Sequence, residues 1–258
     1  MKIITALFAL SMPLLYAVPS HAALVAFYTF DGNAIDVTGN GNDGVVNGAT
    51  LAGGYEGQAY RFDGLNDYIS IPLNLNSSNM ASVTMGAWAN ASNLGSIRTV
   101  ISHDDGGYDR DLNIDSRGAG SGYRYSVFTG SGVDSVGPDP APTNQWVFVS
   151  ARYDSAAHTV TLDVGNERAT FAATPGAGFN TARIGGSPIH GGAEFFSGLI
   201  DNVFVYDEVL SNDKIDQIRL GGVAAIQPVP VPGAFWLFGA GISGFLGLNR
   251  RRSIKPAQ

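Results

Sequence analysis

The sequence predicts an all-β protein, a two-sheet antiparallel sandwich of the jelly-roll type, followed by a C-terminal hydrophobic helix. Short runs rich in β-branched and aromatic residues recur along the chain, and Gly, Asn, Asp and Pro separate them about every 8–12 residues. Several runs alternate apolar and polar residues, a period of two that is typical of strands with one buried face. The many turns favour antiparallel pairing, and about a dozen strands fit one sandwich.

The runs with this pattern are expected to form strands in chain order. They cover residues 24–30, 67–71, 82–88, 99–102, 112–114, 123–128, 146–153, 159–164, 182–184 and 198–206. One stretch differs, because Ser211 can cap a short helix. That helix should place Ile215, Ile218 and Leu220 on one side and end at Gly221.

The N-terminal segment, residues 1–22, has the features of a secretory signal peptide. Lys2 precedes an apolar stretch, and Ser20-His21-Ala22 forms a small-x-small cleavage pattern before Ala23. The alternative, an uncleaved anchor helix, is weakened by Pro13 within the apolar stretch. Export favours disulfides, but the chain has no cysteine, so stability must come from the core and from any bound metal.

The other end, residues 228–258, combines a proline motif, an apolar run and an arginine cluster. The apolar run at 233–248 is shorter than the roughly 20 residues of a full transmembrane helix, but Arg250 to Arg252 suit a cytoplasmic flank. This order resembles the PEP-CTERM class of sorting signals, although Val231 stands where that class often has Glu. The resemblance implies export through the inner membrane, anchoring by this helix, cleavage by an exosortase-type membrane protease and a final place at the cell surface or outside the cell. A plain C-terminal anchor is the alternative.

The body between these ends, residues 23–227, is a strongly acidic globular domain. The whole chain is 45% hydrophobic and 14% charged, which excludes disorder. The body contains 10 basic and 22 acidic residues, a formal charge of -12. Such a surface repels phosphate backbones, so nucleic acid is excluded as a partner. Neutral or cationic partners, including divalent metal ions, are favoured.

Five pieces of the body carry a family resemblance, and they occur in the expected order. They lie at residues 27–44, 60–69, 83–88, 146–149 and 196–203 and include Phe-Tyr-Thr-Phe-Asp-Gly-Asn, Tyr-Arg-Phe-Asp-Gly and Gly-Leu-Ile-Asp. They resemble a laminin G-like domain of the concanavalin A-like lectin/glucanase superfamily, over about residues 24 to 222. The resemblance implies the jelly-roll fold, but one fold serves many functions.

The glycosidases of that superfamily need closely spaced carboxylates on one strand, and the body lacks them. Glu56, Glu167, Glu194 and Glu208 are far apart. The nearest substitute is the alternating row at Asp109, Asp111, Asn113 and Asp115, which we expect to form a solvated strand face. The chain also lacks a Cys nucleophile, a Gly-x-Ser-x-Gly elbow and a His-x-x-x-His pair. The protein is therefore predicted not to be an enzyme.

Calcium is the expected metal, because loops rich in Asp, Asn and Gly supply its oxygen ligands. Asp31, Asp36 and Asn40 offer this density near the N-terminus. Related jelly rolls often hold a structural calcium between the first and last strand regions, and by that resemblance Asp201 is the distant ligand. The alternative is that these residues form Asx turns with their own backbone.

Sugar recognition needs exposed aromatic rings beside hydrogen-bonding groups. The candidates are Tyr108, Tyr123 and Tyr125, near Asp109 and Asp111. The alternative is that the tyrosines are half-buried with only their hydroxyl groups at the surface. The sequence thus predicts an exported, non-enzymatic binding or matrix protein with polysaccharide or extracellular protein as its partner. A hydrolase with an unusual Asp pair and a purely structural surface protein are the alternatives.

Overall fold

The computed structural model describes residues 23–118, 120–189 and 194–226 of the 258-residue chain. The expected signal peptide at 1–22 and the sorting signal at 228–258 lie outside the described residues. The described chain forms two units, a β-rich one that ends at Ser211 and a helical one that begins at Asn212. Within these ranges, no helix has both the length and the apolar character needed to cross a bilayer.

The β-rich unit contains two antiparallel sheets, in agreement with the predicted sandwich. In chain order the strands are β1 (Leu24–Tyr28), β2 (Val45–Asn47), β3 (Thr50–Gly53), β4 (Gln58–Asp63), β5 (Tyr68–Ile71), β6 (Ser82–Ala91), β7 (Arg98–Ser102), β8 (Asp111–Asp115), β9 (Arg124–Phe128), β10 (Val133–Ser135), β11 (Val147–Asp154), β12 (Thr159–Val164), β13 (Glu167–Ala172), β14 (Ala182–Ile184) and β15 (Ser197–Tyr206). The ten strands expected from the alternation are confirmed within a few residues at each end.

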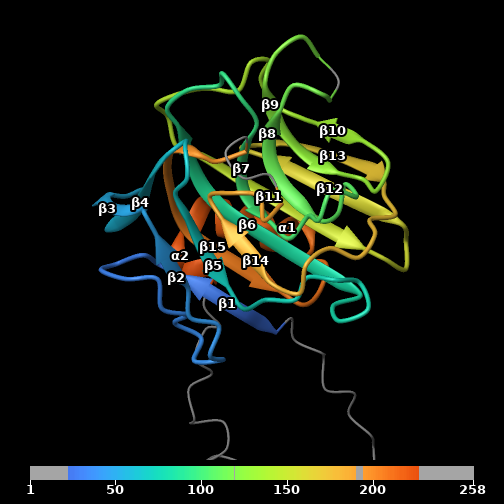
Figure 1. Ribbon diagram of the computed structural model, residues 1–258. Coiled ribbons are helices and arrows are strands. Elements are labelled where there is room, and N and C mark those ends of the chain that lie inside the picture. The colour runs from blue at the N-terminus through green and yellow to red at the C-terminus, as the bar shows by residue number, and fades with distance from the viewer. Residues whose placement is uncertain (1–22, 119, 190–193, 227–258) are drawn as a thin grey trace, which may run out of the picture. The chain divides into compact units, whose positions relative to one another are not determined.

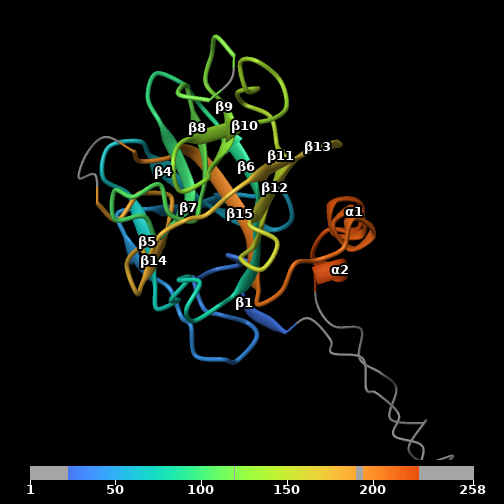
Figure 2. The ribbon, with the colours of Figure 1, turned by 90° about the vertical axis from the view of Figure 1, so that its right-hand side faces the viewer.

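The two sheets lie face to face as separate layers (Figures 1 and 2). The larger sheet has the order β13-β12-β11-β6-β15-β4-β3, and β1 also pairs with β15. The smaller sheet has the order β10-β9-β8-β7-β14-β5-β2. Strands distant in the chain thus become neighbours, and β15 joins the first strand to the middle of the larger sheet. This non-local pairing is typical of jelly rolls.

The space between the sheets is filled by the inward side chains of both. In β6 these are Val83, Met85 and Ala87, and in β8 they are Leu112 and Ile114, all fully buried. These inward residues are two positions apart in each strand, as the alternation in the sequence predicts, because successive residues of a strand point to opposite faces.

The strands absent from the sequence prediction are β2, β3, β4, β10 and β13. Two of them have three residues each, which is too short to show alternation. β3 and β13 bury no residue fully, so they lack an apolar face. β4 differs from these, because its Tyr60 and Phe62 are buried in the core.

The helical unit contains α1 (Asn212–Gly221) and α2 (Val223–Ile226). Asp213 in the first turn of α1 and Arg219 in its last turn complement the helix dipole. Ile215 and Ile218 are buried as expected, but Leu220 is 76% exposed. The expected place of Leu220 is wrong because a residue two positions after Ile218 lies on the opposite side of a helix.

Candidate functional site

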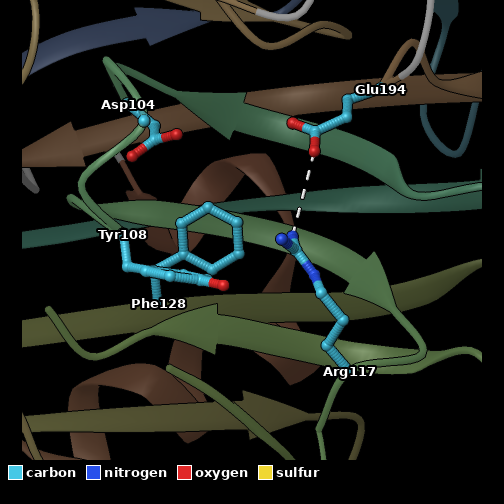
Figure 3. Close-up of a pocket in the computed structure, with 6 residues that line it drawn as sticks. Asp104, Tyr108, Arg117, Phe128 and Glu194 are labelled. Atoms are coloured by element: carbon cyan, nitrogen blue, oxygen red, sulfur yellow. Dashed lines mark ion pairs between the residues drawn. The ribbon is translucent and has the colours of Figure 1, made fainter. Parts of the chain in front are cut away.

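A pocket of about 230 Å³ opens on the outer face of the smaller sheet, the face that points away from the core (Figure 3). Two of its lining side chains are aromatic, two are acidic and one is basic. The lining residues are Asp104, Gly106, Tyr108, Arg117, Phe128 and Glu194. They come from the loop between β7 and β8, from the ends of β8 and β9, and from the segment before β15.

The strands present polar side chains to this outer face because their apolar residues point the other way. Leu112 pairs with Val127 across β8 and β9, and both belong to the core. The adjacent residues Asp111 and Phe128 therefore face outward. Asn113 follows the same alternation and hydrogen-bonds with Ser126 on β9.

The loop between β7 and β8 brings Asp104 and Tyr108 into the pocket, and its own carboxylates hold its shape. Oδ1 of Asp104 accepts the backbone N–H of Asp109 at 2.9 Å. Oδ2 of Asp109 accepts the backbone N–H of Asp105 at 3.3 Å. Tyr108 has a positive φ of 56°, which turns the chain back toward β8.

His103 fixes the base of this loop and is a structural residue. Its Nε2 accepts the backbone N–H of Arg110 at 3.2 Å, and its Nδ1 lies 3.2 Å from the carbonyl oxygen of Phe179. Burial lowers the pKa of His103 to about 4, so the ring is neutral at pH 7. Both ring nitrogens are engaged, which leaves neither for a metal ion.

The aromatic wall of the pocket is formed by Tyr108 and Phe128, whose rings meet edge to face at a centroid distance of 5.2 Å. The guanidinium carbon of Arg117 lies 5.4 Å from the Tyr108 ring centre and 5.3 Å from that of Phe128. Figure 3 shows the two rings on one side of the pocket and Arg117 on the other. Rings and guanidinium stabilise one another through packing and cation–π attraction.

The charges around the pocket are predominantly negative. Arg117 binds Asp115 with Nη2 to Oδ2 at 2.5 Å and Nε to Oδ2 at 2.8 Å. Its distance to Oε1 of Glu194 is 3.8 Å. Burial acts to lower the pKa of Arg117, but the hydrogen bond and charge of Asp115 and the charge of Glu194 raise it overall. Arg117 therefore stays charged and paired.

The alternating row on β8 is buried, so the prediction that it forms a solvated face is wrong. Asp109, Asp111, Asn113 and Asp115 are each at most 1% exposed. Arg117 lies against Asp115, and Asn113 is paired with Ser126. Neither carboxylate oxygen of Asp111 accepts a hydrogen bond of normal geometry from any described residue.

Two members of this row hold their protons more tightly than ordinary aspartates. Burial raises the pKa of Asp111 well above its usual value, and the charges of Glu194 and Asp104 act in the same direction. The neighbouring Ser102 and Asn113 side chains offset only part of this rise. Burial also raises the pKa of Asp109 to about 6.

Comparison with known proteins identifies the family to which this domain is related. Residues 62–216, more than half of the chain, match the laminin G family Laminin_G_3, described as the Concanavalin A-like lectin/glucanases superfamily. The chain belongs to this superfamily. No curated protein matches the chain at a significant level.

Solved structures share the concanavalin A-like fold at low sequence identity. Domain 4 of AbnA, a GH43 extracellular arabinanase from Geobacillus stearothermophilus in complex with arabinotriose, has a TM-score of 0.56 and 20% identity, covering 77% of this chain and 98% of that one. The binding domain of botulinum neurotoxin DC, in complex with rat synaptotagmin II, has a TM-score of 0.57 and 14% identity, covering 80% of this chain and 52% of that one.

A third structure concerns botulinum neurotoxin type C, whose cell entry depends on two ganglioside molecules. It has a TM-score of 0.54 and 12% identity, covering 80% of this chain and 51% of that one. The chain thus spans about half the length of these toxin domains. These similarities show the common fold.

The concanavalin A-like domain places the five expected sugar-binding residues in different environments. Tyr108 lines the pocket, whereas Asp109 and Asp111 are buried beside it. Tyr125 is fully buried in the core, because it pairs with Ile114 on the inward face. Tyr123 is half-buried against the core. The expectation of an exposed ring at Tyr125 is therefore wrong.

Most residues of the pocket were missed by sequence reasoning. Phe128 was expected only as the end of a strand, and Glu194 only as an isolated glutamate. Arg117 has no sequence signal beyond its position two residues after Asp115. Asp104, next to His103 in a glycine-containing loop, had the clearest signal, because acidic loops at strand ends often carry sites.

Three of the residues expected to bind calcium, Asp31, Asp36 and Asn40, lie in the loop between β1 and β2, and the fourth, Asp201, lies in β15. Asp36 and Asn40 belong to the loop after β1. Oδ1 of Asp36 accepts N–H groups of Phe27 and Thr38, and its Oδ2 accepts the backbone N–H of Asn42 at 3.3 Å. Nδ2 of Asn40 donates to the carbonyl oxygen of Val25 at 2.9 Å. These contacts are the Asx-type turns of the alternative interpretation.

Asp31 and Asp201, by contrast, meet at one turn, the turn between β3 and β4. Oδ1 of Asp31 accepts the backbone N–H of Gln58 at 2.9 Å. Oδ2 of Asp201 accepts those of Tyr55 and Glu56 at 2.8 Å and 3.0 Å. Burial raises the pKa of Asp201 to about 7, and the charge of Asp31 acts in the same direction.

This pair fits a cation in two respects. Oδ1 of Asp201 is buried without a hydrogen-bond partner among the described residues. The nearby charge of Asp31 is unfavourable for a second carboxylate unless a cation lies between them. Within the described ranges, no cluster of three or more His, Asp or Glu side chains is arranged to hold a metal ion, so backbone carbonyls or water must complete any site.

Proposed function

We propose that the protein is an exported, non-enzymatic carbohydrate-binding protein and that the pocket of the smaller sheet is its binding site. The observation that supports this most is the combination of Tyr108 and Phe128 with the polar side chains of Asp104, Arg117 and Glu194 in one cavity of about 230 Å³. An apolar ring surface with a few converging polar groups is the arrangement used by small-ligand sites. The volume is below the roughly 300–1,000 Å³ of pockets that enclose a drug-sized ligand, so the cavity would hold only part of an oligosaccharide.

The related structures support the choice of ligand. The arabinanase domain is in complex with arabinotriose, and cell entry of botulinum neurotoxin type C depends on gangliosides. Both are carbohydrates or carry them. The shared fold is compatible with a carbohydrate ligand but does not indicate where on the domain it binds.

A binding role is favoured over hydrolysis by the position of the carboxylates. A glycosidase needs two carboxyl groups that flank the scissile bond. Asp109 and Asp111, the expected substitute pair, do not line the pocket. The two carboxylates that do line it have other contacts, since Asp104 accepts the backbone N–H of Asp109 and Glu194 faces Arg117. Asp109 instead holds the loop through the backbone N–H of Asp105. These contacts support a role in shaping the pocket.

The proposed location follows from the chain ends. We propose that residues 1–22 direct export and that residues 228–258 anchor the protein in the membrane, where an exosortase-type protease releases it to the cell surface or matrix. The acidic body, with a formal charge of -12, suits an exported protein that avoids nucleic acid.

The Tyr108→Ala variant tests the carbohydrate site. We expect about tenfold weaker retention on the sugars that the wild-type chain binds in a glycan array, because the variant removes one ring of the wall. Tyr55→Ala is a matched control, since Tyr55 is 41% exposed and lies on the β3–β4 turn, outside the pocket. Loss of binding in the control with retention in Tyr108→Ala would place the site elsewhere.

We further propose that Asp31 and Asp201 hold a structural calcium ion, without Asp36 or Asn40. The ion would neutralise two carboxylates and tie the segment after β1 to β15 and to the β3–β4 turn. Calcium prefers such carboxylate and carbonyl oxygens.

The Asp201→Asn variant tests this metal site by thermal unfolding with calcium and with a chelator. Calcium should stabilise the wild-type chain, by about 2.7 kcal/mol when its concentration is about 100 times the Kd. The variant should lose this response, because a neutral amide is a poorer ligand. Asp36→Asn, which makes the same change of charge further along the β1–β2 loop, should keep it. An equal calcium response in all three chains would exclude the site.

A further inference from the structure

Ala23, the residue before β1, is held to Asp207, the residue after β15, by two hydrogen bonds. The backbone nitrogen of Ala23 donates to Oδ1 of Asp207 at 3.1 Å, and the backbone nitrogen of Asp207 donates to the carbonyl oxygen of Ala23 at 3.2 Å. The two residues are 184 positions apart in the chain and continue the β1–β15 ladder, in which Leu24 pairs with Tyr206. The tertiary fold therefore sets the position of the Ala23 nitrogen.

The other edge of β1 is covered by side chains of the loop that follows it. Nδ2 of Asn40 donates to the carbonyl oxygens of Leu24 and Val25 at 3.1 Å and 2.9 Å. Nδ2 of Asn42 donates to the same oxygen of Val25 at 2.9 Å. The strand thus has β15 on one edge and these amides on the other, so its first residues are tied along both edges.

Asp207 is an exposed carboxylate for which the described chain provides no cationic side chain. Among the described residues, no Lys, Arg or His side chain forms an ion pair with it. Basic groups are scarce in a body with a formal charge of -12. A positive charge at the Ala23 nitrogen would lie 3.1 Å from a carboxylate oxygen, a distance at which opposite charges attract.

The sequence predicts that a positive charge arises at this atom. Ser20-His21-Ala22 is a small-x-small cleavage pattern, and the peptide bond that it marks joins Ala22 to Ala23. Hydrolysis of this bond by an endopeptidase of the export pathway consumes one water molecule, breaks the C–N bond and leaves a carboxylate on Ala22 and an amine on Ala23. Because an α-amine is largely protonated at pH 7, the nitrogen that donates to Asp207 becomes an ammonium group.

We propose that Asp207 is the docking site of the α-ammonium group of Ala23, the N-terminus that processing creates. This inference rests on the proposed export of the chain by residues 1–22 and goes beyond the proposed carbohydrate function. A charge-assisted hydrogen bond is shorter and stronger than the neutral one that it replaces. The ion pair holds the start of β1, since chain termini are the places where folded proteins open most readily.

The docking depends on the position of the cut. A cut one residue earlier leaves an uncharged amide nitrogen at Ala23, and a cut one residue later removes the Ala23 nitrogen from the chain. Either product lacks the ion pair with Asp207, although both keep the pairing of Leu24 with Tyr206. Only the cut that the sequence pattern marks places the ammonium group against the carboxylate.

The test measures the mass of the exported chain and the amide hydrogen exchange of β1. The full chain, expressed with its own leader in a bacterial host, should have Ala23 as its first residue after export. Asp207→Asn keeps an acceptor oxygen but removes the charge. In this variant residues 24–28 should exchange about two- to fivefold faster than in the wild-type chain, the factor that an exposed ion pair supports. Exchange reports the pair because its loss raises the population of the locally open strand.

Selective acetylation of the α-amine removes the charge of the other partner and leaves one N–H that can donate to Asp207. It should accelerate the exchange of β1 by a similar factor. Acetylation of the Asp207→Asn chain should add little, because the two changes remove the same interaction. Glu208→Gln is the matched control, since its hydrogen bond with Thr84 uses the backbone oxygen of residue 208. It changes the net charge equally and should leave the exchange of β1 as in the wild-type chain.

The outcomes separate the docking from the export on which it rests. A chain that stays inside the host overturns the proposed export and the docking with it. An exported chain that keeps residues 1–22, or begins at a residue other than Ala23, overturns the docking and leaves export standing. Equal exchange of β1 in Asp207→Asn and wild type, additive effects of the two changes, or an equal effect of Glu208→Gln also overturns it. The glycan array with Tyr108→Ala tests the carbohydrate function independently of these results.

Discussion

Replacing Asp163 with alanine should lower the free energy of unfolding by about 3–5 kcal/mol, the cost of breaking a buried ion pair. Asp163 lies in β12 and is 1% exposed. Its oxygens accept Nε of Arg152 at 3.0 Å, Nη2 of Arg152 at 3.2 Å and Oγ of Ser150 at 2.9 Å, and Nε of Arg168 also donates to it. Arg152 is itself only 4% exposed. The variant leaves that guanidinium buried without the carboxylate.

Urea denaturation at neutral pH, followed by tryptophan fluorescence, measures this effect. Asp216→Ala is the control, because Asp216 pairs with Arg219 at 3.5 Å in α1 and its side chain is 44% exposed. Exposed pairs contribute about 0–1 kcal/mol. Similar losses in the two variants would show that burial of Asp163 does not set the strength of its interaction.

The strands that carry the pocket could be predicted from sequence, because alternation is a local property. Leu112 and Ile114 point inward wherever the strand lies, so Asp111 and Asn113 must point outward. What covers that outward face is decided elsewhere in the chain. Glu194 comes from the connection between β14 of the smaller sheet and β15 of the larger one, so its place at the pocket depends on the fold of the whole domain. The alternation of apolar and polar residues in β8 therefore does not distinguish an outward face that is solvated from one that other segments bury.

The residues expected to bind calcium show the same limit of prediction from sequence. Asp31 and Asp36 lie in the same loop rich in Asn and Gly, between β1 and β2, and composition does not distinguish them. The two carboxylates differ in the groups that donate hydrogen bonds to them. Asp36 accepts N–H groups from its own loop and from β1, whereas Asp31 accepts the N–H of Gln58, at the start of β4. Gly57, with φ of 63°, lies so close to Asp31 that a Cβ there would meet its Oδ1. That approach is a tertiary feature which no sequence pattern contains.

The Asp111→Asn variant should be more stable than the wild-type chain at neutral pH, by about 1–3 kcal/mol, the usual cost of an unsatisfied buried group. Burial, with Glu194 and Asp104, raises the pKa of Asp111, so the folded chain keeps a proton that the unfolded chain releases above about pH 3.9. Wild-type stability consequently falls as the pH rises from there toward the folded pKa. Asparagine does not titrate, so the variant lacks this loss.

The unfolding free energies of the variant and of the wild-type chain, measured at about pH 4 and about pH 8, test this prediction. The stability advantage of the variant should be larger at the higher pH. His103, whose pKa burial lowers to about 4, gives a slope of the opposite sign between about pH 4 and 6.5, but it is present in both chains and cancels. Asp134→Asn in β10, where Asp134 is half-buried, is the control and should show no such growth. A variant less stable than wild type at both pH values would contradict the prediction.

Carbohydrate binding by the same variant tests whether Asp111 also serves the pocket, although the proton kept on Asp111 in the folded chain means that the substitution removes no full charge. Gain of stability with loss of affinity is the expected signature of a residue that serves a ligand at the expense of the fold. A residue that only supported the sheet would lose stability on substitution, and affinity would follow from the damaged fold. The direction of the stability change thus distinguishes the two roles of Asp111, independently of which sugar the pocket binds.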